Sequence, residues 1–145
     1  EPVADISVKS SVLKPIKLSG NIISRLIDEL PILFIACTCC KGTSVIRDIE
    51  ELRHKESDRI KSMEDGLIKL GIKVKSTSNS ISITGGTLNG GIINSYSDHR
   101  VAMSFIIAGL VSSKSITVLD TGNINTSFPN FVEILKDQNI EIYNL

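Results

Sequence analysis

The sequence has little of what nucleic-acid-binding, membrane-spanning or disordered proteins need. Its 16 basic and 16 acidic side chains cancel, so the formal net charge is zero. Non-specific binding to nucleic acid or to an anionic membrane needs a surplus of positive charge, so neither is expected as a partner. The sequence contains no run of about 18 apolar residues and no recognisable signal peptide. Glycine and proline are modest and 41% of the residues are hydrophobic, which is typical of one globular domain.

Cysteine is also scarce. The three cysteines, Cys37, Cys39 and Cys40, lie in one apolar run. An odd number, packed so closely and without a nearby histidine, fits neither a disulfide framework nor a zinc site. We therefore expect buried, reduced thiols in a cytoplasmic protein, and no metal site.

Hydrophobic periodicity predicts strands and helices that alternate along the chain. Residues 32–37 and 101–111 are apolar on all sides and predict buried helices, which Asp28 and Asp98 would cap. Amphipathic helices are predicted from about Ser57 to Leu70 and from Ser127, which would cap the second of them. Short extended segments or strands are predicted at 6–18, 43–47, 72–75, 81–84, 92–95, 115–119 and 140–143.

The predicted elements form a repeat. Asp28 and Ser57 are 29 positions apart, as are Asp98 and Ser127, and 70 positions separate the two pairs. Each unit reads strand, buried helix, strand, amphipathic helix, strand, and a further strand closes the first unit only. We therefore expect an α/β fold of repeated βαβαββ units at about residues 1–91 and 92–145. The second unit would lack its last strand. The start without methionine, already in a strand-like alternation, also suggests a piece of a longer protein.

Ionisable residues gather at three equivalent places, each at the N-terminal end of a predicted helix: Asp28, residues 55–59, and residues 98–100. If the units stack side by side, these ends face the same way. Helix N-termini present free N–H groups and partial positive charge, which favour an anionic ligand. Arg59 and Arg100 can add bidentate recognition of carboxylate or phosphate. Asp28 and Glu56 can transfer protons, with His99 nearby.

Each of these residues also has a purely structural interpretation. Residues 52–60 alone read as a solvated, charge-paired helix start. Asp28 and Asp98 are about equally well explained as N-caps, and Arg59 can pair with Glu56 or Asp58. Arg100 is harder to explain in this way, because a positive charge is disfavoured at a helix N-terminus, so it favours an anionic partner.

Four stretches resemble the successive C-terminal motifs of the 5-enolpyruvylshikimate-3-phosphate synthase family. They are Ser24-Arg25-Leu26-Ile27-Asp28-Glu29-Leu30-Pro31, Leu52-Arg53-His54-Lys55-Glu56-Ser57-Asp58-Arg59, Asp98-His99-Arg100-Val101-Ala102-Met103 and Thr126-Ser127-Phe128-Pro129. Their order and spacing hold over essentially the whole chain. The resemblance implies the enolpyruvyl transferase fold, with buried helices inside and sheets outside. It also implies that this chain is the C-terminal part of one domain of a two-domain enzyme.

The resemblance implies transfer of the enolpyruvyl group of phosphoenolpyruvate to the 5-hydroxyl of shikimate 3-phosphate, with release of phosphate. This reaction belongs to the shikimate pathway, which leads to chorismate and the aromatic amino acids. The partners implied are the two substrates and the remainder of the same enzyme, and no cofactor is implied.

The resemblance also implies a role for each site residue. Asp28 resembles the proton acceptor at the 5-hydroxyl, Glu56 the partner acid, and Lys55 a ligand of shikimate 3-phosphate, which Asp28 also binds. Arg59 and Arg100 resemble ligands of phosphoenolpyruvate, with His99 beside them. Arg53 and Asp58 keep the structural interpretation, as salt-bridge and cap residues.

One position departs from the family pattern. Thr126 stands where many members have a lysine that contacts phosphoenolpyruvate, which places the phosphate contacts more heavily on Arg59 and Arg100. Two alternatives remain open. One is an enzyme like UDP-N-acetylglucosamine enolpyruvyl transferase, which has the same fold and an analogous reaction. The other is a non-catalytic fragment that, when isolated, binds anions weakly at most.

Overall fold

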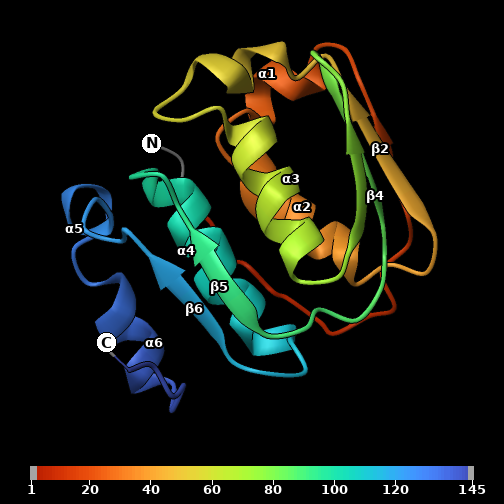
Figure 1. Ribbon diagram of the computed structural model, residues 1–145. Coiled ribbons are helices and arrows are strands. Elements are labelled where there is room, and N and C mark those ends of the chain that lie inside the picture. The colour runs from red at the N-terminus through yellow and green to blue at the C-terminus, as the bar shows by residue number, and fades with distance from the viewer. Residues whose placement is uncertain (1–2, 144–145) are drawn as a thin grey trace.

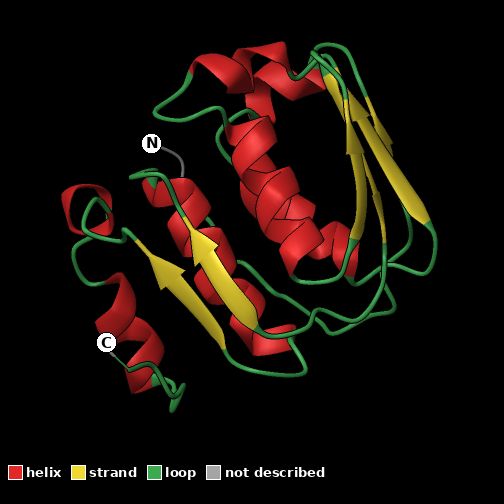
Figure 2. Cartoon of the chain, in the orientation of Figure 1, coloured by secondary structure: helices red, strands yellow, loops and turns green. Residues whose placement is uncertain are grey.

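Helices and strands alternate through residues 3–143, the part of the chain that the computed structural model describes (Figures 1 and 2). In chain order they are β1 (Lys17–Leu18), α1 (Ile22–Leu26), α2 (Leu30–Thr38), β2 (Thr43–Arg47), the 3₁₀ helix η1 (Glu50–His54), α3 (Arg59–Lys69), β3 (Lys73–Ser76), β4 (Ser80–Thr84), β5 (Gly91–Asn94), α4 (His99–Ala108), the 3₁₀ helix η2 (Gly109–Val111), β6 (Ile116–Leu119), α5 (Ile124–Ser127) and α6 (Phe131–Asp137). The fold is α/β, as the sequence predicts. No helix among these residues is long and apolar enough to cross a membrane.

The first sheet has four strands in the order β1-β2-β4-β3. β1 pairs with β2 in parallel, β4 is antiparallel to β2, and β3 and β4 form the predicted antiparallel hairpin. Ile46, Val74, Ile81 and Ile83 alternate with more exposed neighbours and are buried. A half-buried sheet produces this period of two, and its apolar face covers α2 and α3.

The second sheet has two strands, β5 and β6, which are parallel and join through α4. In Figure 1, α4 lies against this sheet, and α2 and α3 lie between α4 and the four-stranded sheet. The three longer helices therefore occupy the inside of the molecule and the sheets flank them. Ile35, Met63, Leu67 and Phe105 belong to the buried cluster that joins the helices.

Helices α3 and α4 approach each other closely at Gly66. A Cβ atom built on Gly66 would lie 2.2 Å from Cζ of Phe105, a separation that real Cβ atoms do not show. The phenyl ring of Phe105 is fully buried and occupies the space where a larger residue would carry its side chain. The glycine therefore sets the distance between the two helices.

Among the described residues, the extended segment expected at 6–18 forms a strand only at its end, in β1, and the strand expected at 140–143 is absent. Residues 3–16 form no strand, and Ile6, Val8 and Val12 are almost fully exposed. Residues 140–143 form none either. Both segments have the alternating pattern of a strand, but a strand needs a hydrogen-bonded neighbour along its length. The first segment bonds to β2 at its last residue, where the Ile16 oxygen accepts the Val45 N–H at 2.9 Å.

Two expectations at helix ends are wrong, and one helix begins two residues later than expected. Glu29, not Asp28, is the N-cap residue of α2, and it makes no side-chain capping bond. The helix expected from Ser57 begins at Arg59 with Asp58 as its cap. Ser127 caps nothing, because residues 124–127 form their own short helix, α5, which Pro129 follows and which is separate from α6.

The cysteines are all unpaired, but only two of them are buried as predicted. Cys37 and Cys40 are buried near the end of α2, whereas Cys39 is exposed. Burial raises the pKa of the Cys37 thiol above its ordinary value, partly offset by a hydrogen bond with Ser44. Cys37 therefore behaves as a small core residue and not as a nucleophile.

Candidate active site

Arg59, the first residue of α3, is the centre of the charged residues. Its side chain is 1% exposed, and each of its nitrogen atoms contacts a different carboxylate. Nε donates to Oδ2 of Asp98 at 2.8 Å, Nη1 to Oδ1 of Asp28 at 3.0 Å, and Nη2 to Oε2 of Glu56 at 2.5 Å. Arg59 thus joins residues from all three of the predicted ionisable clusters.

The helix starts place these side chains. Oδ1 of Asp58 accepts the Lys61 N–H at 3.0 Å and so fixes the first turn of α3. Its other oxygen pairs with Nη1 of Arg53 at 2.5 Å. The predicted structural roles of Asp58 and Arg53, cap and salt bridge, are confirmed. They leave Arg59 to point into the molecule, away from its sequence neighbour Asp58.

Asp98 is buried, with 0% of its side chain exposed, and uses both oxygens. Oδ1 accepts the backbone N–H groups of Arg100 at 2.9 Å and Val101 at 3.2 Å, so Asp98 is the predicted N-cap of α4. Oδ2 accepts from Arg59 and from the Ser57 hydroxyl, which lies 3.1 Å away. The sequence did not predict this second contact, because nothing local links residues 39 positions apart.

The charges of this pair stabilise each other. Burial alone raises the pKa of Asp98, but the Arg59 guanidinium, the Val101 N–H and the Ser57 hydroxyl outweigh it and hold that pKa below its ordinary value. Burial likewise lowers the pKa of Arg59, but Asp98, Glu56 and Asp28 outweigh it and raise that pKa. Asp98 and Arg59 are therefore both ionised at neutral pH, and Asp98 does not supply a proton.

Arg100 and His99 lie at the edge of the same cluster. Nη1 of Arg100 donates to the backbone oxygen of Asp28 at 2.9 Å, and Nη2 lies 3.5 Å from Oδ2 of the same residue. Oε1 of Glu29 is 3.9 Å from Nη1 of Arg100. Nδ1 of His99 lies 3.8 Å from Oε1 of Glu56. The anionic partner that the position of Arg100 favours is thus present within the chain.

Two of the residues singled out from the sequence are not part of this cluster. Lys55 pairs with Glu51 one helical turn earlier, at 2.5 Å. Thr126 lies in α5, where its hydroxyl donates to the backbone oxygen of Asn123 at 2.8 Å. The structure therefore brings together Asp28, Glu56, Arg59, His99 and Arg100, but not Lys55.

A hollow of about 220 Å³ opens beside Arg100. Asp28, Glu29 and Arg100 form its charged end. Its remaining lining is largely apolar and comes from α2, α4, the segment that joins α5 to α6, and the start of α6: Ile32, Met103, Ser104, Ile107, Phe128 and Phe131. The rings of Phe128 and Phe131 are tilted against each other, with centroids 5.7 Å apart. The sequence motif contained Phe128 but gave no reason to place it near Arg100.

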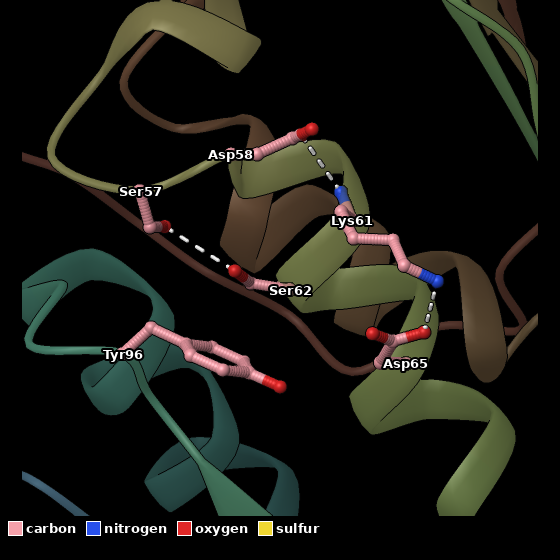
Figure 3. A pocket seen from close by; sticks show the side chains of 6 residues that line it. All are labelled: Ser57, Asp58, Lys61, Ser62, Asp65 and Tyr96. Carbon is pink, nitrogen blue, oxygen red and sulfur yellow. Dashed lines mark hydrogen bonds and ion pairs between the residues drawn. The ribbon is translucent and has the colours of Figure 1, made fainter.

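A second hollow, of about 370 Å³, lies along α3 (Figure 3). Polar side chains line it: Ser57, Asp58, Lys61, Ser62, Asp65 and Tyr96. Ser57 connects it to the cluster, because its hydroxyl donates to Asp98 and accepts from Ser62 at 3.3 Å. Tyr96 and Ser97 both have positive φ angles, 55° and 57°, in the turn that precedes Asp98.

The cluster carries more negative than positive charge. Asp28, Glu29, Glu56 and Asp98 surround Arg59 and Arg100. The arrangement can hold a cationic side chain rigidly and can offer half-exposed carboxylates for proton transfer. A ligand with several negative charges would need further cations from elsewhere. Residues 3–143 contain no group of three or more His, Cys, Asp or Glu side chains that could hold a metal ion.

The fold is that of the enolpyruvyl transferases. The enolpyruvyl transferase NikO from Streptomyces tendae superimposes on 93% of this chain with a TM-score of 0.74, at 19% identity, and 30% of NikO is covered. The EPSP synthase from Acinetobacter baumannii superimposes on 87% of the chain with a TM-score of 0.84, at 42% identity, and 30% of that chain is covered.

The sequence comparisons identify one family within this fold. The family model of EPSP synthase (3-phosphoshikimate 1-carboxyvinyltransferase) matches residues 1–135. The 3-phosphoshikimate 1-carboxyvinyltransferase of Coxiella burnetii is 45% identical over 142 residues, which make up 98% of this chain and 32% of that protein. The chain belongs to the EPSP synthase family, and it spans about a third of the length of the curated relatives it matches.

Proposed function

We propose that the protein carrying these residues transfers the enolpyruvyl group of phosphoenolpyruvate to the 5-hydroxyl of shikimate 3-phosphate and releases phosphate. The observation that carries this proposal is that Asp28 contacts both Arg59 and Arg100, while Glu56 also pairs with Arg59, so that residues from three separate helix starts meet. Family membership supports the choice of reaction and substrates. The other partner in the proposal is the remainder of the same enzyme, and the place of action is the cytoplasm.

The reaction needs two proton transfers that later reverse. In the addition step, the hydroxyl oxygen bonds to C2 of phosphoenolpyruvate as its proton leaves, and the methylene carbon takes up a proton to become a methyl group. In the elimination step, the methyl group loses a proton and the phosphate leaves with its bonding electrons. We assign Asp28 to the hydroxyl proton and Glu56 to the proton at the methylene carbon. Both carboxylates are about half exposed, so substrate can reach them.

The arginines supply the charge that an anionic substrate needs. In this proposal, Arg59 and Arg100 hold the carboxylate and phosphate of phosphoenolpyruvate, with His99 beside them. A guanidinium has five N–H donors, and the three carboxylates that contact Arg59 accept one hydrogen bond from each of its nitrogens. The remaining N–H donors on Nη1 and Nη2 are available to a ligand. Arg100 is a third exposed and lies at the mouth of the 220 Å³ hollow, which makes it the more accessible of the two.

Shikimate 3-phosphate is assigned to Asp28 and Lys55. The assignment of Lys55 requires it to leave Glu51, a surface pair of the kind that contributes little free energy and is easily exchanged. We also propose the division of the chain into two repeat units near residue 91, with β1-α2-β2-α3-β3-β4 as the first unit and β5-α4-β6-α6 within the second.

A phosphate-release assay on the full-length polypeptide tests the proposal. We expect release only when both phosphoenolpyruvate and shikimate 3-phosphate are present. Replacement of shikimate 3-phosphate by UDP-N-acetylglucosamine tests the alternative transferase of the same fold. Absence of phosphate release with phosphoenolpyruvate and shikimate 3-phosphate would refute the proposal. Release with phosphoenolpyruvate and UDP-N-acetylglucosamine, but not with shikimate 3-phosphate, would favour the alternative.

A further inference from the structure

Asp98 ties together the two arginines assigned to phosphoenolpyruvate. One of its oxygens accepts the backbone N–H of Arg100 at 2.9 Å and so fixes where α4 begins. The other accepts Nε of Arg59 at 2.8 Å. The two arginines are 41 positions apart in sequence, on different helices, and a single carboxylate spans both. No other residue in the cluster contacts Arg59 through Nε.

We propose that Asp98 is a positioning residue that sets the orientation and separation of Arg59 and Arg100, and thereby the affinity for phosphoenolpyruvate. This inference rests on the proposed function. Because Nε is held from the buried side, the Nη1 and Nη2 edge of Arg59 faces the half-exposed carboxylates of Asp28 and Glu56. Because the cap fixes the first turn of α4, it also fixes the point at which the Arg100 side chain leaves that helix.

Helix capping alone does not explain Asp98. A cap needs one oxygen, and serine performs that role as well as aspartate. Asp58, the cap of α3, shows the ordinary case, because its second oxygen pairs with Arg53 and its side chain is 38% exposed. Asp98 is 0% exposed. Burial of a carboxylate costs free energy unless the carboxylate is paired. The contact with Arg59 is therefore what allows Asp98 to be fully buried. The Ser57 hydroxyl completes it at 3.1 Å.

The test uses the same substitution at both capping aspartates of the full-length enzyme. Asp98→Ser keeps a cap oxygen but cannot reach Arg59, and Asp58→Ser is the matched control on α3. We expect Asp98→Ser to raise the KM for phosphoenolpyruvate by about tenfold or more, the scale of a lost hydrogen bond to a charged group. The KM for shikimate 3-phosphate should change much less. Asp58→Ser should leave the ratio of the two KM values unchanged.

A purely structural role predicts a different result. In that case Asp98→Ser lowers the melting temperature and the active fraction, but both KM values stay at their wild-type values, and the inference is overturned. If Asp98→Ser does not fold, the isosteric Asp98→Asn, which removes the charge, decides in the same assay. Wild-type KM for phosphoenolpyruvate in Asp98→Asn also overturns the inference. Lack of turnover by the wild-type enzyme would instead refute the proposed function, so the two failures are distinguishable.

Discussion

At the scale of single residues, Arg59 is a buried cation. The carboxylates that contact it carry more negative charge than its one positive charge balances. A lone guanidinium in the interior would cost several kcal/mol, and the three carboxylates offset that cost. The contact with Glu56 was predictable, because Glu56 lies only three residues before Arg59, just ahead of the same helix. The contacts with Asp28 and Asp98 were not, because they depend on how distant helices pack.

The two half-exposed carboxylates are expected to act in the chemical step. In the full-length enzyme, Asp28→Ala and Glu56→Ala should each lower kcat by roughly 10²-fold or more, the scale of lost general acid–base help. Steady-state kinetics with both substrates measures this. Asp65→Asn is the control, because Asp65 pairs with Lys61 outside the cluster. A kcat within a factor of two of wild type in either alanine variant would remove that residue from the proposed mechanism.

Asp98 should make stability depend on pH in the acid range. Its pKa is held below the ordinary value of about 3.8, so its contribution is fully present above about pH 4 and is lost as the pH falls through the lowered value. We expect the free energy of unfolding of the wild-type protein to exceed that of Asp98→Asn at pH 7. The difference should shrink below about pH 4, as measured by urea unfolding at several pH values. A difference that does not vary with pH would contradict the assigned ion pair.

At the scale of helices, the contact between Gly66 and Phe105 sets how closely α3 and α4 pack. Gly66→Ala would normally favour a helix by about 1 kcal/mol. Here the added methyl group meets the Phe105 ring, so we expect the free energy of unfolding to fall by about 1–3 kcal/mol.

Thermal unfolding of two further variants checks this explanation. Gly109→Ala adds the same methyl group where nothing lies within 4 Å, and it should be neutral or slightly stabilising. Phe105→Leu combined with Gly66→Ala should recover part of the loss, because it removes the ring. Equal stability of Gly66→Ala and Gly109→Ala would show that the helices adjust without cost.

Helix and strand interiors were more predictable than their ends. The strand at Thr43–Arg47 and the β3–β4 hairpin lie where the apolar alternation and the turn residues predict them. Asp28 looked like a cap because it precedes an apolar run by the usual distance. Its carboxylate instead contacts two arginines, and the backbone of Glu29 begins the helix. A cap and a ligand of arginine have the same residue type, so sequence cannot distinguish them.

At the scale of the whole molecule, the local charge predicts how the isolated chain behaves. Four carboxylates surround two guanidiniums, so a dianion that approaches the cluster meets net repulsion. We expect residues 1–145 alone to show no turnover and to bind phosphoenolpyruvate with a Kd of about 1 mM or weaker. Isothermal titration calorimetry, after circular dichroism has shown that the chain folds, measures the affinity. Turnover or micromolar binding by the isolated chain would contradict this expectation.

The order of helices and strands could be predicted from the sequence, but which strands pair with each other could not. Repeated patterns indicate which segments are equivalent, and residues 17–84 contain the expected succession of strands and helices. Residues 140–143 have the same alternation as a strand but form none, because hydrogen bonding in a sheet depends on a neighbour. An apolar alternation predicts the conformation that a segment can adopt, and the rest of the fold decides whether it does.

The position of Arg59 also has a consequence for how the chain folds. Two of its three carboxylate partners lie far away in sequence, 31 positions before it and 39 positions after it. An intermediate in which α4 has not yet docked lacks the Nε partner of Arg59. One in which α4 docks without Arg59 in place buries a lone Asp98. The first state leaves Arg59 with only Asp28 and Glu56, and the second buries an uncompensated carboxylate, so both lie above the native state in free energy. We therefore expect the same contacts that orient the site to make α3 and α4 fold and unfold as one cooperative unit.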